Sequence, residues 1–378
     1  MLARRVAVGT AIVACTALVA LAAPTIGRAP LGRASASHRG PRVTVAFTGD
    51  FLATHATWRV ARANAGGHGY DFRPMLRPLG SLTRSADLAI CHLETPLTGR
   101  GVRLNDYPRY AVPYQLADAI RRAGYDGCST ASNHSLDHGS AGIRSTLDEL
   151  DSLGIGHTGT ARSRREAART VLYRVGDAVI AHLSYTASFN GLIPRHAWEA
   201  NHIDVDRILD RARRARRQGA DIVVLSLHWG TEHRHPPTNE QEALAQRLTA
   251  SKAIDLIVGH HAHVVQPIRR VHWRYVAYGL GNSFSGMTAA LFSPAVQDGM
   301  VLLVTFELGP RKWHVHRVRF APTWVQPGRF VVRLVGPAID ARRLPTAVIR
   351  DLRRSWRRTV TTVDAARVGV VAFRRARL

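Results

Sequence analysis

Six apolar segments of this 378-residue sequence each lead into a residue whose side chain can bind a metal ion. These residues are Asp50, Glu94, the pair Asn133 and His134, His228, the cluster His260, His261 and His263, and Asn282. Helical patterns at 112–123, 140–153, 204–217 and 238–252 lie between several of the segments. Strands that alternate with helices predict an α/β domain, in which loops at the carboxyl ends of the strands converge on a ligand. Each polar residue alone is better explained as a loop cap or a hydrogen-bonded histidine, but six in series predict one shared site.

The residue types predict the chemistry of that site. Carboxylate, amide and imidazole ligands together suit borderline divalent metals such as Mn²⁺, Fe²⁺, Co²⁺ or Zn²⁺. We expect His261 and His263 to lie on an extended segment, where alternate side chains point the same way. His260 is an alternative ligand to His261, and the sequence does not choose between them. One or two ions are expected, and two ions about 3.5–4 Å apart are a common device for hydrolysing phosphate esters.

Two cysteines, Cys91 and Cys128, lie inside apolar segments that are typical of buried strands. Free cysteine is common at such positions, so we favour two buried thiols. A disulfide between them is the alternative, if the chain folds in an oxidising compartment.

The N-terminus predicts export. A short basic region, "MLARR", precedes an uninterrupted apolar run at 6–23. The predicted domain organisation is a signal peptide or membrane anchor at 1–23, a linker at 24–41 that is rich in proline, glycine, serine and alanine, a main domain at 42–335 and a basic helical tail at 336–378. We therefore expect an extracytoplasmic protein, either secreted or anchored in the membrane by its N-terminus.

Positive charge is concentrated at the end of the chain. The formal net charge is +25, and residues 311–378 carry 17 basic and three acidic residues. One explanation is the arginine-rich codon usage of a GC-rich genome. Another is attraction to an anionic polymer or to an anionic membrane face. Nucleic acid is a weaker explanation, because no nucleic-acid-binding module accompanies the arginines.

Six short motifs, in order along the chain, carry a family resemblance. They are "FTGD" (47–50), "LETPLT" (93–98), "SNHSLDHG" (132–139), "HWGTEH" (228–233), "GHHAHVVQP" (259–267) and "YGLGNSF" (278–284). Together they resemble the poly-γ-glutamate capsule synthesis (CapA) family of the calcineurin-like metallophosphoesterase superfamily. The resemblance covers roughly residues 42–308. It implies a four-layer αββα sandwich as the single main domain, with metal ions bound at the strand ends.

The resemblance also implies a role for each matching residue. Asp50 and His263 would bind a first ion, Glu94 would bridge two ions, and Asn133, His228 and His261 would bind the second. His134 would stabilise the transition state or protonate the leaving oxygen, and Asp137 would orient an imidazole.

The sequence departs from the wider superfamily at the first motif. The superfamily usually has a histidine two residues after the first aspartate, whereas position 52 here is leucine. The first ion is therefore short of one nitrogen ligand, which His55, His92 or water would replace. We expect three further histidines, His138, His233 and His235, to lie on the rim.

Two functions follow from this site. The first is a metal-dependent hydrolase or transferase that acts on a phosphoester, or on an amide of an anionic cell-surface polymer such as poly-γ-glutamate. The second is non-catalytic binding or tethering of such a polymer during export, assisted by metal and arginine. The expected partners are the polymer or phosphoester, the membrane surface and the polymer-synthase machinery.

Overall fold

The computed structural model describes residues 40–363 and 369–372 of the chain. The predicted signal peptide or anchor, nearly all of the linker and parts of the basic tail lie outside these residues. Within the described ranges, no helix combines the length and the apolarity that crossing a lipid bilayer requires.

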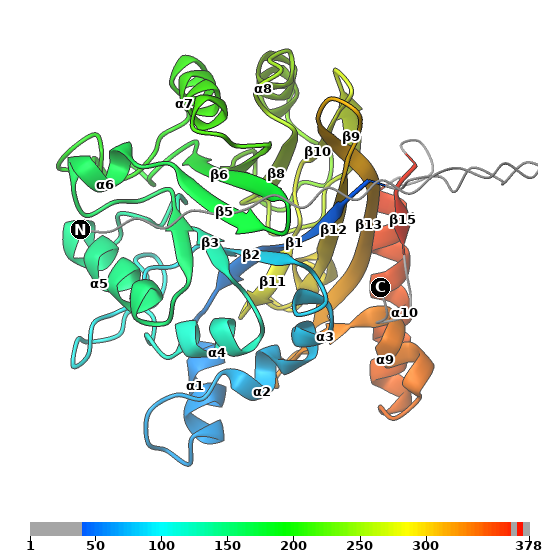
Figure 1. The fold of residues 1–378 in the computed structure, drawn as a ribbon. Coiled ribbons are helices and arrows are strands. Elements are labelled where there is room, and N and C mark those ends of the chain that lie inside the picture. The colour runs from blue at the N-terminus through cyan, green and yellow to red at the C-terminus, as the bar shows by residue number, and fades with distance from the viewer. Residues whose placement is uncertain (1–39, 364–368, 373–378) are drawn as a thin grey trace, which may run out of the picture. The chain divides into compact units, whose positions relative to one another are not determined.

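The strands form two sheets (Figure 1). The first has the order β14-β13-β12-β1-β2-β3-β4, with β11 beside β1 and β15 beside β13. Its strands are β1 (Arg42–Leu52), β2 (Leu88–Leu93), β3 (Gly127–Ser129), β4 (Gly156–Thr158), β11 (Asn282–Ser285), β12 (Asp298–Leu308), β13 (Trp313–Val325), β14 (Val332–Leu334) and β15 (Val371–Ala372). Strands β1 to β4 run parallel, so their carboxyl ends lie at one edge.

The second sheet has the order β5-β6-β7-β8-β10-β9. Its strands are β5 (Val171–Val175), β6 (Ala178–Thr186), β7 (Ile222–His228), β8 (Leu256–His260), β9 (Ile268–Val271) and β10 (Arg274–Ala277). Here β6, β7, β8 and β10 run parallel, and the segments joining the first three include a helix each.

The helices occupy segments between strands and the end of the chain. They are α1 (His55–Asn64), α2 (Arg73–Leu76), α3 (Gly80–Thr83), α4 (Leu116–Arg122), α5 (Gly139–Ser152), α6 (Arg164–Ala168), α7 (Val205–Arg217), α8 (Asn239–Thr249), α9 (Val335–Ala341) and α10 (Thr346–Val363). Two short 3-10 turns, η1 (Arg77–Leu79) and η2 (Pro294–Gln297), complete the set.

Three buried clusters define four layers. One cluster lies between the sheets and takes side chains from β1, β2 and β12 on one side and from β6, β7 and β8 on the other. A second joins the outer face of the first sheet to α1, α2, α4 and α5, and a third joins the outer face of the second sheet to α7 and α8. Figure 1 shows these helix groups on opposite sides of the two sheets. The αββα sandwich predicted from the resemblance is confirmed.

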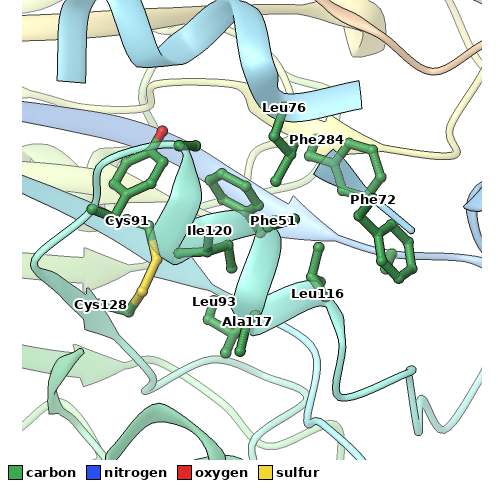
Figure 2. Packing of buried hydrophobic residues seen from close by; sticks show 14 of the residues in the cluster. Phe51, Phe72, Leu76, Cys91, Leu93, Leu116, Ala117, Ile120, Cys128 and Phe284 are labelled. Atoms are coloured by element: carbon green, nitrogen blue, oxygen red, sulfur yellow. A yellow bond between two sulfur atoms is a disulfide. The ribbon is translucent and has the colours of Figure 1, made fainter. Parts of the chain in front are cut away.

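Alternation along β1 explains how one strand serves two layers. Val43, Val45 and Phe47 belong to the cluster between the sheets, whereas Ala46 belongs to the outer cluster. Phe51 also belongs to the outer cluster, because the strand register shifts between Phe47 and Asp50 and resets the alternation. Successive side chains of a strand point to opposite faces, so an apolar run buries both. Figure 2 shows the outer cluster, where Phe284 packs near Phe51 with ring centroids 6.3 Å apart.

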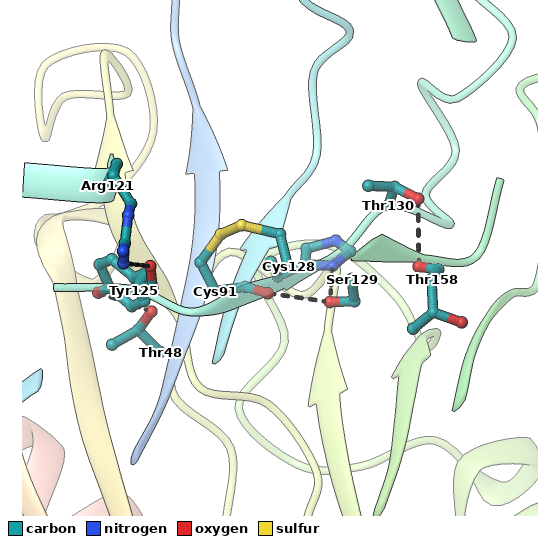
Figure 3. The surroundings of a disulfide bond; sticks show 9 residues. Thr48, Cys91, Arg121, Tyr125, Cys128, Ser129, Thr130 and Thr158 are labelled. Atoms are coloured by element: carbon teal, nitrogen blue, oxygen red, sulfur yellow. Dashed lines mark hydrogen bonds between the residues drawn. A yellow bond between two sulfur atoms is a disulfide. The ribbon is translucent and has the colours of Figure 1, made fainter. Parts of the chain in front are cut away.

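The prediction of two free thiols is wrong, because Cys91 and Cys128 form a disulfide. The two residues are directly paired in the parallel register of β2 and β3, with Cα atoms 4.4 Å apart. Figure 3 shows the bond linking the two strands. Strand pairing is a tertiary property, and the spacing of cysteines along the sequence does not reveal it.

Candidate metal centre

Residues from both sheets meet at the carboxyl ends of the parallel strands. Asp50 lies near the end of β1 and Glu94 follows β2, while His228 ends β7 and His260 ends β8. All four are buried, with Asp50 and Glu94 at most 1% exposed. The convergence predicted from the sequence is therefore present.

Asp50 contacts three parts of the histidine segment. Its Oδ1 lies 3.2 Å from His260 Nδ1, and its Oδ2 lies 3.2 Å from His263 Nδ1 and accepts a hydrogen bond from the backbone N–H of His261. Although burial acts to raise the pKa of Asp50, the hydrogen bonds with His260 and His263 hold it well below its usual value. Asp50 is therefore a carboxylate at neutral pH.

Glu94 is the least satisfied group of the site. Both carboxylate oxygens are buried and neither has a hydrogen-bond partner among the described residues. Its nearest histidine nitrogens are His263 Nε2 at 3.5 Å and His228 Nε2 at 3.9 Å from Oε1. Burial raises the pKa of Glu94 well above its usual value, against the opposing attraction of His263. A buried carboxylate is stable when it is paired or bound to a metal, and the described residues supply no lysine or arginine to either Glu94 or Asp50.

Two ligand groups share Glu94. One consists of Asp50, Glu94 and His263, and the other of Glu94, His228 and His261, each with candidate ligand atoms within 4.8 Å of one another. The amide oxygen of Asn133 lies 2.9 Å from His228 Nε2 and so borders the second group. This donor set, of carboxylate, amide and imidazole, would suit divalent cations, and Glu94 is common to both groups.

A chain of hydrogen bonds continues from His228 away from the two ligand groups. His228 Nδ1 lies 2.9 Å from His92 Nε2, and His92 Nδ1 lies 2.8 Å from Ser129 Oγ, which donates to the carbonyl of Cys91 at 3.3 Å. The last of these contacts is drawn in Figure 3, beside the disulfide. If each N–H donates toward Ser129, His228 Nε2 carries no proton, and it and the Asn133 oxygen 2.9 Å away both present lone pairs that a cation would bind. Burial, and then the surrounding imidazoles, also hold the pKa of His228 well below its usual value.

The prediction of an extended His-x-His segment is wrong. Strand β8 ends at His260, and His261 and His263 adopt left-handed backbone conformations with φ of 88° and 55°. Non-glycine residues rarely occupy this region, which costs of order 1 kcal/mol or more per residue. Both imidazoles still belong to the ligand groups, and the backbone N–H of His261 donates to Asp50. The backbone is strained at the two residues that bring these rings to Asp50 and Glu94.

His134 and Asp137 form a buried pair next to the cluster. His134 Nδ1 lies 2.8 Å from Asp137 Oδ2, and this oxygen also accepts the backbone N–H of Tyr110 at 2.7 Å. The ring of Tyr110 packs edge-on against His134, with centroids 4.7 Å apart. The imidazole is therefore fixed on two sides and keeps Nε2 for other chemistry.

Four residues outside the predicted ligand set also belong to the site. They are His92, Glu232, His260 and Asn282. His92 stacks on His260 with ring centroids 4.0 Å apart, and Asn282 Oδ1 lies 3.0 Å from His263 Nδ1. Glu232 is exposed and forms a candidate group with His261 and His263. Its position in the "HWGTEH" motif, four residues after His228, was the signal available in the sequence.

The sequence did not choose between His260 and His261 as a ligand. In the structure both lie in the cluster, on different sides. His260 faces Asp50, whereas His261 joins Glu94 and His228. Among the replacements considered for the missing nitrogen, His92 belongs to a group with Asp50 and His228. His55 is exposed at the start of α1 and packs against Trp58.

Of the three predicted rim histidines, only His233 has a contact with a candidate ligand among the described residues. His233 is half-buried with its ring centroid 6.2 Å from that of His263, and His235 Nδ1 lies 2.7 Å from the carbonyl of Val265. His138 is exposed at the N-terminus of α5.

Comparison with known sequences identifies the family. The sequence model described as "Bacterial capsule synthesis protein PGA_cap" matches residues 44–287, which is more than half of the chain. The chain belongs to this family. Among its relatives are the capsule biosynthesis protein CapA of Bacillus anthracis, 28% identical over 44% of this chain, and the PGA biosynthesis protein CapA of Bacillus subtilis, 32% identical over 41% of it. The matched segments span 42% and 41% of those two proteins, less than half of their length.

Solved structures give looser matches to this family member. A calcineurin-like phosphoesterase, YfkN of Bacillus subtilis, matches with a TM-score of 0.48 at 11% identity, covering 85% of this chain and 99% of that one. The NAD nucleotidase of Haemophilus influenzae also gives a TM-score of 0.48, at 10% identity, covering 89% and 58% of the two chains. The layer arrangement described above is defined by the strand pairing of this chain itself.

Proposed function

We propose that this protein is an exported, metal-dependent hydrolase or transferase in the synthesis of a bacterial capsule or similar anionic surface polymer of the poly-γ-glutamate type. Glu94 carries the proposal, because its buried carboxylate has no hydrogen-bond partner among the described residues and lies between two sets of ligand atoms. Family membership supports the biological setting. The substrate class is a phosphoester, or an amide of the polymer.

The chain's own residues have distinct tasks in this proposal. Asp50, Glu94 and His263 hold one divalent ion, and Glu94, Asn133, His228 and His261 hold a second. Bound there, such ions supply Lewis acidity and activate water for attack at neutral pH.

His134 is proposed to act on the leaving group. His134 donates its Nδ1–H to Asp137, and this hydrogen bond fixes the ring. Nε2 then faces away from Asp137 and can hold or deliver a proton. Tyr110 restrains the ring from the other side. This arrangement suits protonation of a leaving oxygen or nitrogen.

Export is part of the proposal. The apolar run at 6–23 behind a basic region supports a signal peptide or an anchor, and the protein would act outside the cytoplasm, secreted or tethered. The disulfide between Cys91 and Cys128 is compatible with an oxidising compartment.

Metal content and turnover test the function together. Wild type, Asn133→Ala and His228→Ala are purified without added metal, analysed for bound elements, and assayed with bis(p-nitrophenyl) phosphate as a generic phosphodiester. We expect one or two ions per wild-type chain, and both metal and turnover reduced by about tenfold or more in each variant. A metal-free wild type, or turnover unchanged in both variants, would rule the proposal out.

A second function is favoured by the excess of arginine. The domain would bind or tether an anionic polymer during export without catalysis. Metal ions or arginine side chains would bind the anionic groups of the polymer. The net surplus of basic residues in 311–378 supports it. Polymer affinity that survives loss of the metal ligands, with no turnover of any ester or amide, would favour this function over the first.

A further inference from the structure

The last long helix, α10, buries one side and exposes an arginine-rich side. Its buried residues are Leu352, Ser355, Thr359 and Val363. Arg350, Arg353 and Arg357 are exposed and, at 100° per residue, fall within an arc of about 60° on the opposite side of the helix. The helix lies beyond the residues that the family model matches, 44–287.

These three arginines differ from the other two arginines of the helix. Arg358 makes two hydrogen bonds to the carboxylate of Asp298 at the start of β12, and Arg354 lies 3.8 Å from Asp351. Arg350, Arg353 and Arg357 have no ion pair with any residue in 40–363 or 369–372. Arg358 therefore fastens the helix to the sheet, while three guanidinium groups remain available on its surface.

The three arginines border a hollow with an apolar floor. It has a volume of about 350 Å³ and is lined by Ile339, Arg350, Arg353, Trp356 and Arg357. Guanidinium groups bind carboxylates in bidentate fashion, and Trp356 and Ile339 offer a surface to the methylene groups between them. The lining suits a ligand that alternates carboxylates with short apolar linkers.

The spacing of the arginines favours an extended ligand. With a rise of 1.5 Å per residue, Arg350 and Arg353 are about 4.5 Å apart along the axis, and Arg353 and Arg357 about 6 Å apart. A single small anion does not engage all three. A polymer with a carboxylate on every repeat does.

An anionic bilayer fits this surface less well. A helix that lies in a membrane interface inserts its apolar side among the lipids. The apolar side of α10 is occupied instead, since Leu352 belongs to a buried cluster with Trp324, Val335 and Ile339. The side that is exposed in the described part of the chain is the arginine side.

We propose that the hollow bordered by Arg350, Arg353 and Arg357 is a docking site for a polycarboxylate strand, separate from the metal centre. The identity of the strand, an anionic surface polymer of the poly-γ-glutamate type, rests on the proposed function. Docking there holds the polymer through several charge-assisted hydrogen bonds, so its affinity falls as salt rises.

Binding of purified poly-γ-glutamate to the full chain tests the site. The variant Arg350→Gln/Arg353→Gln/Arg357→Gln is compared with Arg207→Gln/Arg214→Gln/Arg217→Gln, which removes three exposed arginines from α7 and lowers the net charge equally. Titration calorimetry at low and at physiological salt gives the affinities. We expect the α10 variant to bind at least about tenfold more weakly, the α7 variant to bind within about twofold of wild type, and the salt dependence to be shallower in the α10 variant.

Several outcomes would overturn the proposal. Equal losses in the two variants would mean that net charge alone attracts the polymer. Unchanged polymer binding in the α10 variant would exclude the site. Loss of binding to phosphatidylglycerol vesicles, with polymer binding intact, would mean that the helix meets a membrane instead.

Two further measurements separate this inference from the proposed function. Metal content of the α10 variant is expected to equal that of wild type, and Asn133→Ala is expected to keep its polymer affinity. If wild type holds no metal but the α10 variant still loses polymer binding, the metal-dependent function fails and the docking site stands. If wild type holds metal and only Asn133→Ala loses the polymer, the docking site fails and the function stands.

Discussion

At the scale of single residues, His92 links groups that are far apart in the sequence. It contacts Ser129 and His228 through its two ring nitrogens and stacks on His260. The sequence offered His92 only as one replacement for a missing ligand of the first ion, because inside β2 it looks like any buried strand residue. Its role depends on β2 facing β7 and β8 across the two sheets, which no local pattern reveals.

Replacing His92 tests whether it positions His228. In His92→Ala, His228 loses its Nδ1 partner, so the proton is no longer held on Nδ1 and metal affinity should fall by about 10- to 100-fold. His92→Gln places a carbonyl oxygen near the former Nε2 and should restore most of the affinity. Metal titration of the three proteins measures this. Equal metal affinity in wild type and His92→Ala would show that the contact does not matter.

At the scale of elements, the disulfide links β2 to β3 one residue before His92 and Ser129 in the strand register. The next pair in the register after Cys91 and Cys128 is His92 and Ser129, the two residues of the hydrogen-bond chain. The sequence could locate both cysteines in strands, but it could not give the strand order or the register that pairs them.

The disulfide should contribute measurably to stability. Its residues are 37 positions apart, and closing a loop of that size lowers the entropy of the unfolded chain by an amount worth about 2–4 kcal/mol. We expect Cys91→Ala/Cys128→Ala to lose that much unfolding free energy in denaturant titrations. Reductant should destabilise wild type to the same extent and leave the variant unchanged. A variant as stable as oxidised wild type would contradict this account.

A second link between elements is the ion-pair cluster of Arg162. Its guanidinium contacts Asp148 and Asp151 on α5 and Glu166 on α6. Burial acts to raise the pKa of Asp151 and of Glu166, but hydrogen bonds from Arg162 outweigh it and lower both pKa values. Arg162 therefore stabilises the folded state only while these carboxylates are charged.

The lowered pKa values of Asp151 and Glu166 predict how the stability of Arg162→Gln changes with pH. Because the folded pKa values are depressed, the stabilisation is complete above the unfolded values near 4 and is lost as pH falls through the folded values. The variant should be less stable than wild type by about 1 kcal/mol at pH 7, since water screens partly exposed pairs, and the difference should shrink toward pH 3. Urea unfolding at both pH values measures it, with Arg144→Gln, an exposed α5 arginine, as the matched control. A difference that grows at low pH would contradict the assignment.

At the scale of the whole molecule, the sequence predicted the kind of fold and the gathering of polar residues, but not how the sheets face one another. Alternation of strands and helices indicates an α/β domain, and the resemblance supplied the four layers. The left-handed backbone at His261 and His263 could not be foreseen, because a His-x-His pattern suits an extended strand equally well. Glu232 was missed although it lies in the "HWGTEH" motif, because only the fold shows that this loop carboxylate lies beside His261 and His263.

We infer that loops far apart in the sequence enclose divalent cations around Glu94. Crystals of the protein grown with Mn²⁺, measured at the manganese absorption edge, test it most directly. We expect anomalous peaks bonded to Glu94, one among Asp50 and His263 and one among Asn133, His228 and His261. Anomalous density that is absent from this cluster, with Glu94 bound instead to a cationic side chain, would contradict it.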